Sequence, residues 1–205
     1  LFGVIVVMFA VFELRDAKET ALERSRANFL TELSSLRIFE FLRFYAYLNA
    51  KLKIWFNGEL FHCKGGLLDL IADESQFEKI YPPFHVEDPT LEFAFTHTNG
   101  FSEEYYSFVN GQYTSDGGTH LSAFREGLLR GINDFANKKF SGDDVREGIL
   151  GAVAIRLKEP VFESQTKNKL GNSEIRSDLV ARVAQAAAQA LHRNTPEAKK
   201  LIAKI

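Results

Sequence analysis

The segment 142–176 constrains the fold more than any other part of the chain, because a helix start, a strand, a proline and a polar loop follow one another within it. Ser141 is a candidate N-cap, and Asp144, three residues later, completes the pattern of a capping box. Residues 150–157 are apolar except for Arg156 and partly β-branched, which predicts a buried strand. Pro160 cannot donate a ladder hydrogen bond, so we expect it to end that strand.

A polar loop and two helices follow. Residues 163–169 contain no apolar side chain, and loops held between regular elements often carry functional residues. A helix is predicted over 173–192, with inward-facing positions at Ile175, Leu179, Val183, Ala187 and Leu191. Thr195 and Pro196 predict the N-cap and the first position of a final helix over 196–205.

The middle of the chain predicts strands and hairpins. Asn57-Gly58 between short apolar runs is typical of a type I′ hairpin, and Asn110-Gly111 is a second signal of this kind. Residues 91–96 alternate and predict a half-buried strand, for which 105–109 is the expected neighbour. Its aromatic side chains are interpreted as core packing. The two glycines in 116–120 permit a tight turn into a helix, whose predicted buried stripe is Leu121, Phe124, Leu128, Ile132 and Phe135.

Composition narrows the possible functions. The 205 residues carry a net charge of −2 and are 45% hydrophobic, so any contact with DNA must come from a local patch. Cys63 is the single cysteine, which rules out an internal disulfide and fits a reducing compartment. The five histidines are scattered, and we predict no metal site.

The first 35 residues differ from the rest of the chain. Residues 1–12 are uncharged but would span only about 18 Å as a helix, which is too short for a bilayer. Residues 13–33 are charged and rich in alanine, which predicts an exposed helix. Because position 1 is not Met, we expect a piece of a longer protein whose upstream part is missing.

Several long motifs point to one family. They are DGGTHLSAFREGL at 116–128, GDDVREG at 142–148 and EPVFESQTKNKLG at 159–171, with YAYLNAKLKIWFNGE at 45–59 and SEEYYSFVNG at 102–111. In this order they resemble the transducer domain of bacterial type IIA topoisomerase ATPase subunits, which are the B subunit of DNA gyrase and the E subunit of topoisomerase IV. The resemblance runs from about Leu36 to the end of the chain.

The resemblance implies an α+β fold. It consists of a mostly antiparallel sheet with helices on one face and a left-handed βαβ crossover, which is the ribosomal-protein-like transducer fold; general principles alone would favour a right-handed crossover. It implies a transducer domain over 36–195, the start of an exit helix toward the cleavage core over 196–205, and an unmatched segment over 1–35. It also implies that the chain leaves the sheet after Asn110-Gly111 through a loop instead of a hairpin.

The function implied is that of a transducer fragment of an ATP-dependent type II DNA topoisomerase, which relays ATP binding and hydrolysis to DNA strand passage. The resemblance places Gln165 and Lys167 at the γ-phosphate of ATP, with Lys169 as the rival cation. Residues i and i+2 of an extended loop point the same way, which would bring Gln165 and Lys167 together. We expect the loop to be mobile in this chain and to bind no nucleotide measurably.

The resemblance also places Arg125 facing duplex DNA. An arginine can contact phosphate without reading sequence, and the structural alternative is an ion pair of Arg125 with Glu126 or Asp134. His120 is interpreted as a hydrogen-bonded structural residue, not as a catalyst.

No catalytic residue and no metal site are assigned in this fragment, because it has no ATPase glycines, catalytic glutamate, acidic metal cluster or catalytic tyrosine motif. Whether it counts as an enzyme by itself is therefore left open. ATP is expected to bind mainly to an ATPase domain outside this sequence, and Mg²⁺ is expected for the full enzyme. The expected partners are duplex DNA, the A- or C-type cleavage subunit of a heterotetramer and a second copy through other domains, in the cytoplasm, without an assigned membrane partner.

Three alternatives stay open, as does the choice between gyrase and topoisomerase IV. Residues 1–35 suggest a membrane-tethered interaction module derived from such a domain. The fold also suits a free-standing RNA- or ribosome-binding domain. Residues 26–37 resemble the phosphoacceptor helix of sensor histidine kinases, but Ser34-Ser35 stands where the acceptor histidine is expected, so a chance helical match or a fusion without signalling function is preferred.

Overall fold

The computed structural model describes residues 5–6 and 36–205, and the chain divides into two compact units, 1–66 and 67–205. The predictions for the hydrophobic segment 1–12, the charged helix 13–33 and the kinase-like stretch 26–37 lie largely outside the described residues. The assignment of 36–195 to one domain stays a prediction.

The first unit contains a helix and a small sheet. Residues 36–48 are helical. Strand β2 (Ile54–Phe56) pairs antiparallel with β3 (Glu59–Phe61) and parallel with β1 (Ile5–Val6). Asn57 and Gly58 both have positive φ, at 48° and 81°, which confirms the type I′ hairpin. One cluster of buried side chains in this unit consists of Leu42, Ala46, Ile54, Phe56 and Phe61.

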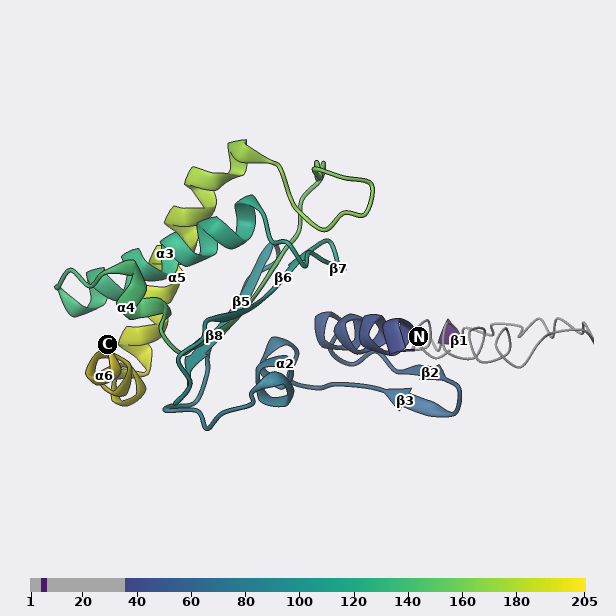
Figure 1. Ribbon diagram of the computed structural model, residues 1–205, viewed down its shortest axis with the longest axis horizontal. Coiled ribbons are helices and arrows are strands. Elements are labelled where there is room, and N and C mark those ends of the chain that lie inside the picture. The colour runs from purple at the N-terminus through teal and green to yellow at the C-terminus, as the bar shows by residue number, and fades with distance from the viewer. Residues whose placement is uncertain (1–4, 7–35) are drawn as a thin grey trace, which may run out of the picture. The chain divides into compact units, whose positions relative to one another are not determined.

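The second unit is built around one five-stranded sheet (Figure 1). Its elements in chain order are α2 (Leu67–Glu74), β4 (Phe84–Glu87), β5 (Leu91–His97), β6 (Glu104–Val109), β7 (Gln112–Tyr113), α3 (Thr119–Ala136), α4 (Gly142–Arg146), β8 (Ile149–Ile155), a 3₁₀ turn η1 (Ser173–Ile175), α5 (Arg176–Arg193) and α6 (Thr195–Lys204). The strand order is β4-β5-β8-β6-β7, and every pair is antiparallel except β6 with β8. This confirms the α+β fold with a mostly antiparallel sheet. Strands β6 and β8 with α3 between them form the βαβ unit, whose hand stays a prediction.

The predicted neighbour of β5 is wrong. Strand β8, not β6, lies beside β5, with Phe93 opposite Val153, and β6 pairs with the other edge of β8. Strand β8 suits the centre of the sheet because its side chains are apolar on both faces, and those of Gly151 and Ala152 near its middle are also small. A strand of this kind can be buried on both faces of the sheet.

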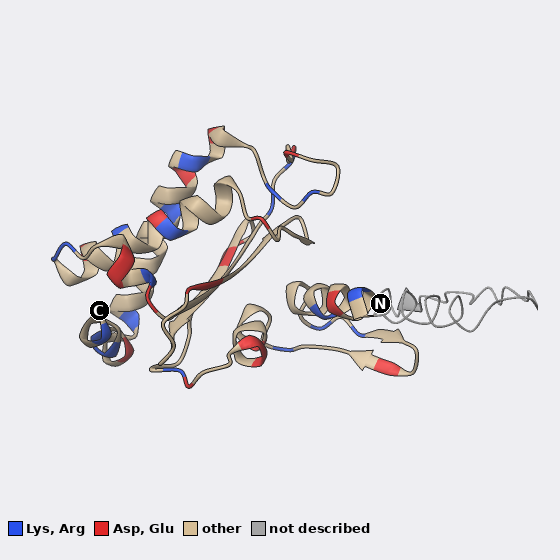
Figure 2. Cartoon of the chain, viewed as in Figure 1, with Lys and Arg blue, Asp and Glu red and all other residues tan. Residues whose placement is uncertain are grey.

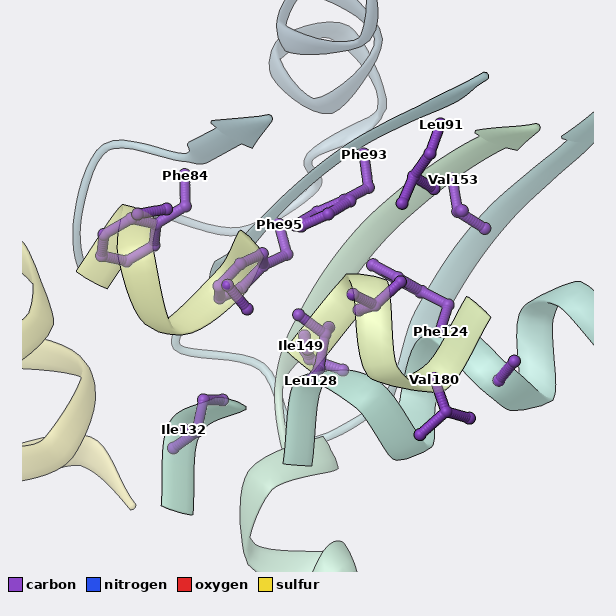
Figure 3. Packing of buried hydrophobic residues seen from close by; sticks show 14 of the residues in the cluster. Phe84, Leu91, Phe93, Phe95, Phe124, Leu128, Ile132, Ile149, Val153 and Val180 are labelled. Carbon is purple, nitrogen blue, oxygen red and sulfur yellow. The ribbon is translucent and has the colours of Figure 1, made fainter. Parts of the chain in front are cut away.

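The prediction that β5 is half-buried is also wrong, because both of its faces are covered. The long helices α3 and α5 pack on one face of the sheet, and the short helix α2 lies on the other (Figure 1). Leu91, Phe93 and Phe95 point with Val153 toward the helix pair (Figure 3), and the Phe93 ring packs against Phe124. This aromatic stripe is core packing, as predicted.

Helices α3 and α5 lie very close together. A Cβ on Gly127 would stand 2.6 Å from Val183 Cβ, and one on Gly131 would stand 2.6 Å from the Ala184 carbonyl oxygen. The buried face of α3 therefore includes both glycines beside Phe124, Leu128 and Ile132, whereas the outer predicted positions Leu121 and Phe135 are only half-buried. On α5 the predicted face is confirmed, with Leu179, Val183, Ala187 and Leu191 buried and Ile175 half-buried in the preceding turn.

Several element ends were predicted, with mixed success. The capping box of Ser141 and Asp144 is confirmed. Strand β8 ends at Ile155, well before Pro160, so the proline is not what ends it. The N-cap of α6 is Asn194, and Thr195 is the first helical residue, because the Thr195 hydroxyl donates to the His192 carbonyl instead of capping the next helix.

The hairpin signal at Asn110-Gly111 is borne out against the expectation from the family resemblance. Both residues have positive φ, at 50° and 83°, and β7 returns antiparallel to β6 with Phe108 opposite Tyr113. The chain therefore turns back on the sheet before it leaves toward α3.

Candidate functional site

The polar loop after β8 folds back on itself in a short hairpin. The Glu163 N–H donates to the Lys169 carbonyl at 3.0 Å, and Phe162 forms a bridge with Leu170. At the tip, the Lys167 N–H donates to the Ser164 carbonyl at 3.1 Å, which closes a four-residue turn.

The tip is not extended, so the geometric argument that Gln165 and Lys167 share a side by alternation is wrong. Lys167 has φ +56°, in the left-handed region. A turn followed by a left-handed residue is a common hairpin ending, usually filled by glycine. A lysine in this conformation carries some backbone strain, and strained residues gather at functional sites. The assignment of both residues to a phosphate contact stays a prediction.

The two rival lysines have different surroundings. The Lys169 ammonium lies 3.0 Å from a Glu163 carboxylate oxygen, and both side chains are about half exposed. Lys167 is exposed, and its ammonium has no ion-pair partner among the residues that the structure describes. Gln165 is exposed beside it. Of the two lysines, Lys167 is therefore the one whose charge is available to an anion.

The base of the hairpin is fastened to the turn that starts α3. The Leu170 N–H donates to the Gly117 carbonyl at 3.0 Å, and the Thr119 N–H donates to the Leu170 carbonyl at 3.0 Å. The Asp116 N–H adds a bond to the Asn168 carbonyl at 3.0 Å. Gly118 has φ +123°, and a Cβ there would lie 2.3 Å from the Leu170 oxygen. The predicted glycine turn is thus confirmed, and its second glycine allows two backbones to touch.

A buried polar cluster lies under this turn. Ser107, Thr114 and His120 are all buried, and the Thr114 hydroxyl lies 3.1 Å from His120 Nε2. Burial lowers the pKa of His120 to about 4. The structural interpretation of His120 is confirmed. Sequence reasoning missed Ser107 and Thr114. The available signal was that Ser107 is a small polar residue directly before the apolar Phe108 and Val109, and that Thr114 follows the return strand.

Arg125 pairs with an acidic residue that the sequence analysis did not name. Its guanidinium lies 3.4 Å from Glu103 and 4.3 Å from the centre of the Tyr105 ring, so the structural alternative of a pair with Glu126 or Asp134 is not the one that the structure shows. Strand β6 follows Glu103 directly, and its pairing with β8 brings this edge under α3. Arg146 also approaches Glu103, at 3.7 Å. The contact of Arg125 with DNA stays a prediction.

Several arginines of the long helices are paired with carboxylates. Glu126 accepts from both Arg130 and Arg176, and basic and acidic residues are interspersed along α3 and α5 (Figure 2). In residues 36–205 there is no cluster of three or more His, Cys, Asp or Glu that could hold a metal ion. None of the helices in the described part of the chain is long and apolar enough to cross a membrane.

The comparisons with known proteins agree with each other. The family model for DNA gyrase B matches residues 44–205. The B subunit of DNA topoisomerase 4 from Borreliella burgdorferi is 46% identical over 162 residues, which cover 78% of this chain and 27% of that protein. The B subunit of DNA gyrase from Clostridium acetobutylicum is 34% identical over 183 residues, covering 78% of this chain and 29% of that protein.

The solved structures extend the agreement to the fold. The 43K ATPase domain of Thermus thermophilus gyrase B, solved with an aminocoumarin, superposes with a TM-score of 0.70 and 30% identity over 82% of this chain and 51% of that one. The chain spans under a third of the length of the two curated relatives. Because the family match covers most of the sequence, the chain belongs to the DNA gyrase B family.

Proposed function

We propose that this chain is the transducer part of an ATP-dependent type II DNA topoisomerase subunit, and that it relays ATP binding and hydrolysis to DNA strand passage. The observation that carries the proposal is the Lys167 ammonium, which lacks an ion-pair partner within residues 36–205 and stands at the tip of a hairpin whose base is hydrogen-bonded to the start of α3. The tip is available to a ligand, while the base is joined to the largest helix pair of the fold.

The chemistry of the tip fits a terminal phosphate. An ammonium on a flexible stem is a compact charge that meets a phosphate oxygen as a point contact. The Gln165 amide can donate a further hydrogen bond without adding charge. The rest of the nucleotide is held by parts of the subunit outside this sequence, and the described residues offer no ligand set for the Mg²⁺ that accompanies ATP.

In this proposal the hairpin responds to loss of the γ-phosphate. When the phosphate leaves, Lys167 loses its partner, and the state in which the hairpin is engaged is no longer favoured. The hydrogen bonds of Leu170 to Gly117 and Thr119 carry the displacement to the first turn of α3. Because α3 packs closely along α5, both helices move together. Duplex DNA, the cleavage subunit and a second copy of the same subunit are the partners of this proposal.

The test compares two lysines in the full-length subunit, assembled with its cleavage subunit. Lys167→Ala should lose most ATP turnover and strand passage. Lys169→Ala is the matched control and should keep most of both, since its ammonium is already paired with Glu163. The reverse pattern would show that the wrong lysine is assigned.

Two further controls separate charge from backbone. Lys167→Gly keeps a residue that suits φ +56° but lacks the ammonium, so it should be as inactive as Lys167→Ala while folding at least as well. The isolated 205-residue chain should show no ATP turnover above a buffer blank; measurable turnover would contradict the proposed division of labour.

A further inference from the structure

His120 is buried with one ring nitrogen unsatisfied. The residue has no exposed surface, and its Nδ1 has no hydrogen-bond partner among the described residues. A buried polar atom without a partner costs free energy, and each such atom in a folded protein needs an explanation. The hydrogen bond that the structure shows for this ring is made by the other nitrogen, Nε2, so we ask what that bond contributes.

The contact of Nε2 is made with the Thr114 hydroxyl, and the surroundings of both ring nitrogens give its direction. The Thr114 hydroxyl has two acceptors within reach besides His120, the Ser107 carbonyl oxygen at 2.8 Å and the Ser107 hydroxyl oxygen at 2.7 Å. The tautomer follows from Nδ1, because an N–H there would find no acceptor among the described residues. We therefore assign the ring proton of the neutral His120 to Nε2, with the Thr114 oxygen as its acceptor at 3.1 Å. A second proton on Nδ1 would place a charge and a donor where residues 36–205 supply no partner, which agrees with the lowered pKa of His120.

Thr114 is the first residue of the glycine turn to which the 162–170 hairpin is hydrogen-bonded. Its carbonyl accepts from the Gly117 N–H at 2.9 Å, and the Gly117 carbonyl in turn accepts from the Leu170 N–H. Its own N–H donates to Ser107 on β6 at 2.8 Å. Thr114 thus joins the sheet to the glycine turn, and His120 joins Thr114 to the first turn of α3.

We propose that His120 is a positioning residue for the Gln165–Lys167 turn, because its Nε2–H fixes Thr114 and, through Gly117, the Leu170 strand of the hairpin. The role in ATP turnover that follows rests on the proposed function. His120 touches neither nucleotide nor DNA in this scheme, and it acts by fixing where the Lys167 ammonium stands.

Amide hydrogen exchange in the whole chain tests the positioning directly. His120→Leu removes the Nε2–H and should speed exchange of the Leu170 and Thr119 amides by about tenfold, the order expected for loss of one buried hydrogen bond. Exchange of the Val153 amide in β8 should change much less. His120→Gln keeps an amide donor and should restore slow exchange at Leu170.

Thr114→Val supplies a second, independent variant that removes the acceptor of the same bond, and it should reproduce the His120→Leu pattern. An equal acceleration at Leu170 and Val153 in these variants would mean general destabilisation and would overturn the proposal. No acceleration at Leu170 would overturn it as well.

Epistasis in the full subunit connects the positioning to turnover. His120→Leu should lower the kcat of ATP hydrolysis in the parent subunit, but in a Lys167→Ala background it should lower kcat no further, because the contact that it positions is already gone. Multiplied effects in the double variant would show that His120 does not act through Lys167 and would overturn the link. The two proposals can fail separately. If His120→Leu speeds amide exchange selectively at Leu170 but Lys167→Ala keeps full ATP turnover, the positioning role of His120 is supported and the phosphate contact of Lys167 is overturned.

Discussion

Gly118→Ala is the sharpest test of the junction between the hairpin and α3. A Cβ at this position would lie 2.3 Å from the Leu170 carbonyl oxygen and 2.5 Å from its nitrogen, and neither atom can move away without moving the backbone. The residue also has φ 123° and ψ −159°, a region that is essentially restricted to glycine. The substitution therefore forces the two backbones apart.

The size of the effect follows from what is lost. The strained backbone costs about 1–3 kcal/mol. Separation also breaks the bonds of Leu170 to Gly117 and Thr119, each of which contributes about 0.5–1.5 kcal/mol. We expect a loss of roughly 4 kcal/mol in the free energy of unfolding, within a range of about 2–6 kcal/mol. For a chain of this size each kcal/mol lowers Tm by about 2–4 °C, so Tm should fall by roughly 8–16 °C.

Urea unfolding and a thermal melt measure this loss, and the chain offers a matched control. Gly171→Ala changes the neighbour of Leu170, but its Cβ would have nothing closer than 3.5 Å and Gly171 does not have positive φ. It should stay within about 0.5 kcal/mol of the parent chain, as unstrained substitutions do. A Gly118→Ala chain as stable as the control would refute the reasoning about this contact.

Three other predictions address the core, the buried histidine of β5 and the DNA contact. Gly131→Ala would place its Cβ 2.6 Å from the Ala184 oxygen, and urea unfolding should show a loss of about 1–3 kcal/mol; an unchanged midpoint would mean that the helices can separate freely. Burial lowers the pKa of His97 to about 4, as it does that of His120, so the unfolded chain takes up these protons first, and stability should fall as pH drops from about 6.5 toward 4, with His97 contributing roughly 2 kcal/mol at pH 5. His97→Gln should remove that contribution and leave the contribution of His120 in urea titrations at each pH, and an unaltered slope would count against it. In the complete enzyme, Arg125→Gln should lower DNA-stimulated ATPase more than basal ATPase, whereas Glu103→Gln, which frees the guanidinium, should raise the stimulated rate; equal effects on both activities would argue against a DNA role.

Local chemistry made much of the fold predictable. The capping box of Ser141 and Asp144 and the turn at Asn57-Gly58 are each specified by residues a few positions apart, and the structure has both. The buried face of α5 follows from helical periodicity alone. These features depend on the conformation of a short segment, which its own side chains largely decide.

Pairings between distant residues could not be predicted in the same way. Nothing in 91–96 or 105–109 indicates that β8 will stand between those strands, because any apolar strand can pair with any other. Glu103 as the partner of Arg125 depends on the same sheet order. The left-handed backbone conformation of Lys167 could not be predicted either, because lysine seldom adopts it and only the closed hairpin imposes it. The interest in Gln165 and Lys167 came from the family resemblance, not from the tripeptide.

The central position of β8 sets the order in which this unit can be assembled. Until β8 is made, the chain can form the β4–β5 hairpin and the β6–β7 hairpin, but no ladder joins them. Closing the sheet requires β8 to insert between β5 and β6, which are consecutive in the sequence but both far from β8, and such non-local pairing is a slow step for folding. During synthesis the inner edges of both hairpins stay unpaired, with the apolar faces of β5 uncovered by α5, which is made later still. That interval is when these edges are most open to pairing with another nascent chain.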